Sequence, residues 1–272
     1  METRNQSVAG HLLPARCDQL KKGRGKKMNY LVKIAGVAAL TAAFAATAVS
    51  AQTVRMGTEG AYPPYNFIND NGEVDGFEKD VGDELCKRAG LDCVWVTNDW
   101  DSIIPNLVSG NYDTIIAGMS ITDERDEVID FTHEYFPPDP SAYVALAGAS
   151  MDVTKGVVSA QTSTIQAAYV ASSGATVVEF ATPEETVAAV RSGEADAVLA
   201  DFAYLNPIVE ASNGELVIVD QSVMIGGGVG MGIRESDGEL KGKMNAAIES
   251  MKADGTLSAL IAKWFDGRVV NY

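Results

Sequence analysis

Two residues of opposite charge, Arg125 and Asp201, lie in sequence contexts where a charged side chain is unfavourable without a partner of opposite charge. Arg125 follows Ser120–Glu124, a segment that combines a strand end with a helix start. A cation there opposes the helix dipole, and an anion bound by the free amides and the guanidinium would reverse that. Asp201 ends the apolar run Ala197–Ala200, where a buried carboxylate is costly unless it is paired. An anion site together with a carboxylate suits a zwitterion, which points to an amino acid.

Both charges also have plainer interpretations. Arg125 would equally serve as a solvated residue or as a partner of Asp126 or Glu127. Asp201 would equally cap the helix that follows it, because aspartate is a preferred helix cap.

Aromatic residues and one further acid lie in predicted loops after strands. Tyr62 and Trp100 would sandwich an apolar or cationic side chain, and the alternative is that they pack in the core. Glu59, close to Tyr62, would receive a positive head group or remain a solvated loop acid.

The elements that would position these residues occur twice. Residues 106–118 and 189–201 show the same sequence of features, 83 residues apart. In each, a helix end is followed by a Ser-Gly stop, an Asp and an apolar strand. Each glycine, Gly110 and Gly193, stands where a helix end favours positive φ. Because ligands bind beyond the carboxyl ends of strands in open α/β sheets, Gly118 and Asp201 are expected to face each other across a cleft.

The remaining pattern predicts an α/β chain of two lobes. Residues 52–140 and 224–272 would form lobe 1, and residues 141–223 would form lobe 2. The segments 141–147 and 224–233 are expected to cross between the lobes. Helices are predicted at Phe77–Ala89, from a cap at Asp101 to Ser109, after Thr122, after the capping box that starts at Thr182, and over Glu239–Met251 and Leu257–Phe265.

The N-terminal residues 1–51 read as a leader. A basic start precedes an apolar run, and Val49-Ser50-Ala51 has the small residues of a signal-peptide cleavage site. Eight of the 21 Lys and Arg residues but only two of the 37 Asp and Glu residues precede position 52, so residues 52–272 hold 13 basic and 35 acidic residues and a net charge of −22. Such an acidic surface argues against binding to nucleic acid or anionic lipid.

Export makes a disulfide between Cys86 and Cys93 the favoured interpretation over two free thiols. The bridge would join the end of helix Phe77–Ala89 to the next strand. His133 is the only histidine after residue 51, and neither cysteine has metal-ligand companions, so no metal or cofactor is expected.

The sequence resembles the periplasmic polar amino-acid-binding proteins of ABC importers, above all the lysine/arginine/ornithine and histidine binders. The resemblance covers residues 53–267 and rests on five segments: Val54–Glu59, Tyr62–Tyr65, Gly76–Glu78, Asn98–Pro105 and Met119–Arg125. It implies a type II periplasmic-binding fold with two α/β lobes joined by a two-strand hinge, and a bridged pair at Cys86 and Cys93. It also implies a periplasmic monomer that binds an L-amino acid and delivers it to an inner-membrane permease.

The resemblance also implies a role for each site residue. The ligand's α-carboxylate would meet Arg125, the Ser120 amide and the turn at Ser163 and Thr164. Its α-ammonium would meet Asp201, with help from Gly118 and Ser120. Its side chain would lie between Tyr62 and Trp100, with a distal cation at Glu59.

The sequence departs from the family at several of these positions. Ala117 and Gly118 replace serines of the basic binders, and Thr162 replaces a glycine of the second-lobe turn. A cyclohexadienyl dehydratase-like enzyme on the same fold is the alternative function, and it would need an additional acid beside the ligand.

Overall fold

The computed structural model describes residues 53–149, 152 and 155–272. The predicted leader and its cleavage site after Ala51 lie outside the described residues. None of the helices in the described ranges is long and apolar enough to span a membrane.

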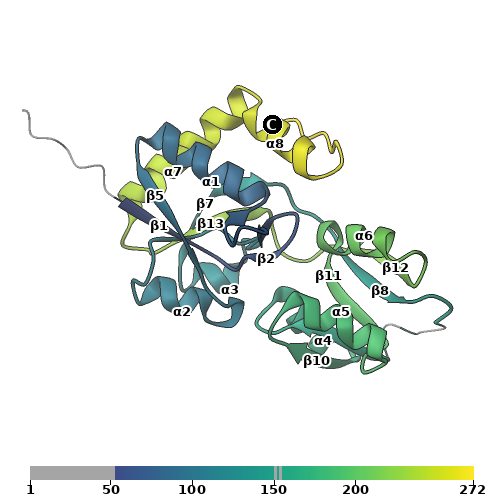
Figure 1. Ribbon diagram of the computed structural model, residues 1–272. Helices are drawn as coiled ribbons and strands as arrows, with labels where there is room; N and C mark the ends of the chain where they lie inside the picture. Colours follow the sequence, from purple (N-terminus) through teal and green to yellow (C-terminus); the bar gives the residue numbers. More distant parts are fainter. Residues whose placement is uncertain (1–52, 150–151, 153–154) are drawn as a thin grey trace, which may run out of the picture. The chain divides into compact units, whose positions relative to one another are not determined.

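The first of two five-stranded sheets has the strand order β5-β1-β6-β13-β7. Its strands are β1 (Thr53–Thr58), β5 (Asp92–Thr97), β6 (Thr114–Ile115), β7 (Asp130–Phe136) and β13 (Val229–Ile233). Strands β5, β1 and β6 run parallel, and β13 is antiparallel to both of its neighbours. Helices α1 (Phe77–Ala89), α7 (Gly238–Ala253) and α8 (Thr256–Trp264) lie on one side of this sheet, and α2 (Ile103–Val108) lies on the other (Figure 1).

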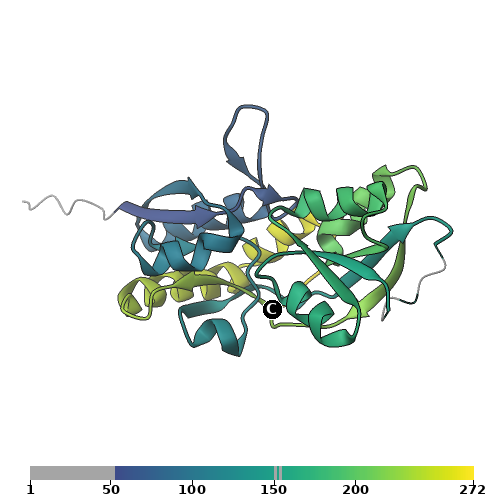
Figure 2. The ribbon, with the colours of Figure 1, turned by 90° about the horizontal axis from the view of Figure 1, so that it is seen from below.

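A small antiparallel sheet of β2 (Ala61–Tyr62), β3 (Asn66–Ile68) and β4 (Val74–Asp75) follows β1. The turn between β3 and β4 is closed by a hydrogen bond from the Gly72 N–H to the Asn69 carbonyl (2.9 Å). Figure 2 shows this hairpin extending away from the first sheet.

The second sheet has the order β10-β9-β11-β8-β12. Its strands are β8 (Ser141–Leu146), β9 (Val157–Gln161), β10 (Thr176–Phe180), β11 (Ala197–Asp201) and β12 (Leu216–Val223), and its helices are α4 (Ile165–Ser173), α5 (Pro183–Ser192) and α6 (Phe202–Ala211). Strands β10, β9 and β11 are parallel, and β8 is antiparallel to β11 and β12. The two sheets confirm the predicted two-lobed α/β class. The chain passes between them at residues 137–140 and 224–228.

The internal repeat has a physical basis in two equivalent helix ends. Gly110 and Gly193 have φ angles of 80° and 77°. After each glycine the next amide bonds back five residues, from Asn111 to Asn106 (3.0 Å) and from Glu194 to Ala189 (2.9 Å). This is the Schellman arrangement, which needs positive φ at the glycine.

The two aspartates of the repeat, Asp113 and Asp196, have the same structural role. The Asp113 carboxylate accepts a hydrogen bond from the Arg55 N–H in β1 (2.9 Å), and the Asp196 carboxylate accepts one from the Val157 N–H in β9 (2.8 Å). Each aspartate therefore aligns its own strand, β6 or β11, with the parallel neighbour. The repeat specifies how each sheet is assembled around the strand that leads to the cleft.

The helical stripe predicted in α1 forms part of the first core. Phe77, Val81 and Leu85 are fully buried and pack in one cluster with Met244 and Ile248 of α7. Helices α7 and α8 pack on the first lobe, as expected from their apolar spacing.

Several helix boundaries test the capping predictions. Thr122 caps the short helix α3 (Asp123–Asp126), and the capping box of Thr182 with Glu185 is present at α5. The predicted cap at Asp101 is wrong: Trp100–Ser102 forms one 3-10 turn, and α2 begins at Ile103 without a side-chain cap. The segment 141–147 is extended as predicted, but β8 within it is an internal strand of the second sheet.

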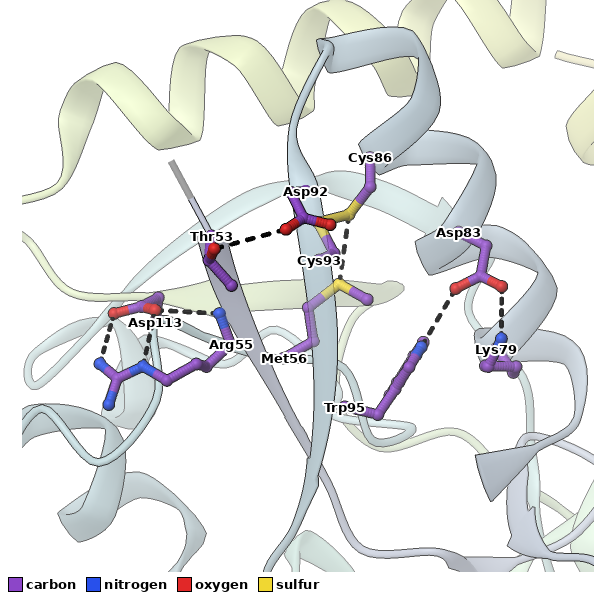
Figure 3. The surroundings of a disulfide bond; sticks show 10 residues. All are labelled: Thr53, Arg55, Met56, Lys79, Asp83, Cys86, Asp92, Cys93, Trp95 and Asp113. Carbon is purple, nitrogen blue, oxygen red and sulfur yellow. Dashed lines mark hydrogen bonds and ion pairs between the residues drawn. A yellow bond between two sulfur atoms is a disulfide. The ribbon is translucent and has the colours of Figure 1, made fainter. Parts of the chain in front are cut away.

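The predicted disulfide between Cys86 and Cys93 is present (Figure 3). It joins the last turn of α1 to β5, which lies at the edge of the first sheet next to β1. The bridge thus fastens the helix to the edge strand beside it.

We expect replacement of both cysteines by alanine to lower the free energy of unfolding by about 2–3 kcal/mol, because the bridge restricts a short loop of the unfolded chain. Denaturant unfolding of the wild type and the double variant measures this. A reductant should destabilise the wild type by the same amount and leave the double variant unchanged. Equal stability of the two oxidised proteins would contradict the prediction.

Candidate functional site

One cavity of about 30 Å³ brings together eight of the nine residues for which the resemblance implies ligand contacts. Its lining comes from both lobes and consists of Glu59, Tyr62, Trp100, Ala117, Gly118, Ser120, Arg125, Gln161, Thr164, Ile165, Gln166 and Asp201.

Arg125 lines this cavity from the first lobe. Its Nη1 donates a hydrogen bond to the Ser120 carbonyl (2.9 Å), and its guanidinium carbon lies 5.4 Å from the ring centroid of Trp100. Burial lowers the pKa of Arg125 to about 10, against the opposing charges of Asp201 and Glu124. The arginine is therefore a partly desolvated cation at the cavity wall, which favours the anion-site interpretation over a solvated residue.

Asp201 lines the cavity from the second lobe. It occupies the N-cap position of α6, but its side chain makes no capping hydrogen bond. Its carboxylate instead accepts hydrogen bonds from the Tyr62 hydroxyl (2.9 Å) and from Nε2 of Gln166 (2.9 Å). Burial raises the pKa of Asp201 to about 6, although the Tyr62 hydrogen bond and the Arg125 charge oppose that rise. Among the described residues, no ion pair joins Arg125 directly to Asp201.

Tyr62 reaches from the first lobe to the second. Its hydroxyl also accepts a hydrogen bond from the Asp201 N–H (3.1 Å), and its ring stacks on Tyr204 of α6 with centroids 4.3 Å apart. One face of the Tyr62 ring is thus covered by a residue of α6. This contact of Tyr62 with Asp201 was not predicted from the sequence.

Glu59 faces an amide from the other lobe. Nε2 of Gln161 donates hydrogen bonds to the Glu59 carboxylate (2.6 Å) and to the Ala181 carbonyl (3.1 Å). Burial raises the pKa of Glu59 to about 7, against the effect of the Gln161 hydrogen bond. The acid is therefore held inside the cavity as a group that changes its charge near neutral pH.

Trp100 and the turn before α4 meet across the cleft. The Trp100 indole N–H donates to the Ser163 carbonyl (3.2 Å), and the Trp100 side chain is only 8% exposed. Ser163 itself, with φ of 57°, lines a neighbouring groove and not this cavity. Thr164 lines the cavity and caps α4, where its hydroxyl accepts from the Ala167 N–H (3.1 Å).

Gly118 and Ser120 lie where β6 leads out of the first sheet. Gly118 has φ of 63°, and its N–H donates to the Glu78 carboxylate (2.6 Å). Its amide is therefore occupied by the protein, while its backbone still lines the cavity beside Tyr62.

The sequence interpretation missed Gln161 and Gln166. They flank the Ser163-Thr164 turn, Gln161 as the last residue of β9 and Gln166 in the first turn of α4. Polar residues at a strand end and the following helix start are the signal that would have found them. Among the described residues, no group of three or more His, Cys, Asp or Glu side chains could hold a metal ion.

Comparison with known proteins gives the family. The model of the bacterial extracellular solute-binding proteins, family 3, matches residues 54–267. The chain belongs to this family.

The family's named relatives are amino-acid-binding proteins. The chain is 33% identical to the L-arginine-binding protein of Pseudomonas aeruginosa, over 85% of this chain and 94% of that protein. It is 31% identical to the lysine/arginine/ornithine-binding periplasmic protein of Escherichia coli, with the same two coverages.

Solved structures match the chain as well. A periplasmic His/Glu/Gln/Arg/opine family-binding protein from Silicibacter pomeroyi, in complex with lysine, is 72% identical with a TM-score of 0.78, over 80% of this chain and 100% of that one. An ancestral amino-acid-binding protein, described as a precursor of cyclohexadienyl dehydratase, is 30% identical with a TM-score of 0.71, over 78% of this chain and 95% of that one.

The raised pKa values of Glu59 and Asp201 predict a pH dependence of stability. The folded protein binds these protons more tightly than the unfolded chain does, so their contribution to stability falls as pH rises from about 4 to about 7. We expect Glu59→Gln to flatten the fall of the melting temperature across this range. The exposed variant Glu194→Gln is the control, and a profile of Glu59→Gln that matches the wild type would contradict the prediction.

Proposed function

We propose that this protein captures an L-amino acid with a polar or basic side chain in the periplasm and presents it to an ABC transporter permease. The observation that carries the proposal is the pair Arg125 and Asp201, which come from helix α3 and strand β11, line one cavity and shift each other's pKa. Opposite charges on two sides of a small desolvated cavity match the two ends of a zwitterion.

The α-carboxylate of the ligand would bind Arg125. The guanidinium forms a planar set of donors that suits a carboxylate, and it gains more from such a pair where water is excluded. Thr164 lies across the cavity at the N-terminus of α4, and Ser120 lies on the Arg125 side. We propose both as further carboxylate contacts, and we leave Ser163 as a residue that acts through its carbonyl on Trp100.

The α-ammonium would bind Asp201. Gln166 and Ser141 donate to Oδ1 of this carboxylate, and Tyr62 donates to Oδ2, so Oδ2 keeps a lone pair that an ammonium can approach. A positive charge there would lower the pKa of Asp201 and keep it ionised. The backbone at Gly118 and Ser120 would complete this end of the ligand site.

The side chain of the ligand would extend toward Glu59. An acid that is buried with a neutral amide partner is stabilised by a cation, which is the chemistry of lysine, arginine, ornithine or protonated histidine. The lysine complex of the 72% identical relative and the arginine-binding relatives support this class. Trp100 and Tyr62 would flank the aliphatic or planar part of the side chain.

Binding would be coupled to closure of the lobes. Three residue pairs are hydrogen-bonded between the lobes beside the cavity: Tyr62 with Asp201, Gln161 with Glu59, and Trp100 with Ser163. They would break as the lobes open, and the connections at residues 137–140 and 224–228 would act as the hinge. A ligand that contacts both lobes stabilises the closed state. The predicted lobe boundaries, with residues 141–223 as lobe 2, are part of this proposal, as are a monomeric state and a cleaved leader.

A dehydratase-like enzyme remains the second candidate because Glu59 is an acid with a raised pKa inside the cavity. The Gln161 amide already engages its carboxylate, and the named relatives are binding proteins, so binding is the better-supported function. Turnover of a cyclohexadienyl substrate by the purified protein would reverse that preference.

The function is tested by a thermal-shift screen of the purified protein against the standard amino acids, ornithine, diamines and dicarboxylates. We expect the largest rise in melting temperature with basic L-amino acids. The absence of a shift with every α-amino acid would contradict the proposal. Calorimetric titration of the best ligand then gives the dissociation constant, and micromolar affinity corresponds to about 8 kcal/mol.

Substitution of either charge should abolish most of this affinity. We expect Arg125→Ala and Asp201→Asn each to weaken binding by about 3–5 kcal/mol, because each leaves an opposite charge of the ligand buried without its partner. Arg191→Ala removes a surface arginine that pairs with Glu215 and should bind like the wild type. Normal titration curves for both cleft variants would refute the assignment.

Glu59 should set preference among ligands. We expect Glu59→Gln to reduce affinity for lysine and arginine much more than affinity for glutamine, because only the cations lose a charge partner. Competition titrations with the three amino acids measure this ratio. A ratio unchanged from the wild type would remove Glu59 from its proposed role.

A further inference from the structure

A buried carboxylate outside the cavity lining contacts one of the first lobe's ligand loops directly. Glu78 is the second residue of α1, and its side chain is fully buried. One oxygen, Oε1, accepts hydrogen bonds from the Gly118 N–H (2.6 Å) and from the Tyr135 hydroxyl. The other oxygen, Oε2, accepts from Nδ2 of Asn66 (2.7 Å). Glu78 therefore fixes the segment 117–120, which carries Gly118 and Ser120.

The second ligand loop is reached through Asn66. Asn66 is also fully buried, and its Oδ1 accepts a hydrogen bond from the Gly60 N–H (2.7 Å). Gly60 directly follows Glu59 and lies two residues before Tyr62. A continuous chain of hydrogen bonds thus runs from Gly60 through Asn66 and Glu78 to Gly118.

This series of hydrogen bonds requires an acceptor at its centre, the position that Glu78 occupies. The three groups that face Glu78 are all donors, and an ionised carboxylate is the side chain that only accepts. Glu78 also lies in the first turn of α1, where the helix dipole stabilises a negative charge. Burial raises the pKa of Glu78, and the hydrogen bonds from Tyr135, Gly118 and Asn66 oppose that rise.

We propose that Glu78 is a positioning residue for ligand binding. It holds the segments 59–62 and 117–120 in a fixed position relative to each other. The inference rests on the proposed amino-acid binding and adds a residue that touches no ligand. Loops that are held in their binding geometry lose less conformational entropy when the ligand arrives, so the network raises affinity as well as stability.

Glu78→Gln tests the network because glutamine cannot satisfy it. If the new carbonyl faces Gly118, the new amide faces the Asn66 donor, and Asn66 can adapt only by turning its own donor toward Gly60. If the carbonyl faces Asn66, the amide faces the Gly118 N–H. Either orientation frees one of the two ligand loops.

The experiment compares dissociation constants and melting temperatures of four full-length proteins: wild type, Glu78→Gln, Asn66→Ala and Thr132→Val. L-lysine and L-arginine are the probes, titrated by calorimetry well below every melting temperature so that the folded fraction is the same. We expect Glu78→Gln and Asn66→Ala to weaken binding roughly tenfold or more, the effect of losing a hydrogen bond to a charged group. Asn66→Ala decides the question alone if Glu78→Gln does not fold.

Thr132→Val is the matched control for a buried hydrogen bond away from the cleft. Thr132 is buried in β7, and its hydroxyl accepts from the Met231 N–H (3.0 Å). We expect this variant to lose melting temperature and keep the wild-type dissociation constant. Wild-type affinity in both network variants, or an equal loss in Thr132→Val, would overturn the inference. Failure of the wild type to bind either probe would instead overturn the proposed function.

Discussion

The cleft depends on one constraint: two opposite charges, Arg125 in α3 and Asp201 at the end of β11, are kept partly desolvated without a direct ion pair between them. Burial moves the pKa of Arg125 down and that of Asp201 up, so each charge is held at a cost. The protein meets that cost with hydrogen bonds to Ser120, Tyr62 and Gln166. In the proposed function, a zwitterion that bridges the two charges would relieve this cost and would thereby couple ligand binding to closure of the lobes.

The rest of the fold serves that placement. The repeated aspartates, Asp113 and Asp196, align the strands that lead to the cleft in each sheet. Behind the first of these strands, Glu78 ties the loop at Gly118 to the loop at Gly60 through Asn66. Between the sheets, Tyr62 and Gln161 each reach an acid of the opposite lobe. The cavity is therefore organised by buried polar contacts, while the apolar cores hold the sheets and helices that carry these contacts.

Much of this was predictable from the sequence because local rules govern it. The helix at Phe77–Ala89, the capping box at Thr182 and the glycine helix ends follow from spacing and φ preference. The predicted helix cap at Asp101 is wrong because the chain forms a 3-10 turn before α2. The Gln161–Glu59 hydrogen bond and the Tyr62–Tyr204 stacking escaped prediction because they join the two lobes, and no local pattern encodes so distant a partner. Gln166 differs, because its partner Asp201 belongs to the same lobe.

The most direct test of the central claim removes each end of the ligand in turn. Calorimetric titration would compare L-lysine with cadaverine, which lacks the α-carboxylate, and with 6-aminohexanoate, which lacks the α-ammonium. If Arg125 and Asp201 grip the two ends, both analogues should bind at least about a hundredfold more weakly than L-lysine, the equivalent of losing one charge-assisted contact. Affinity for either analogue equal to that for L-lysine would contradict the account.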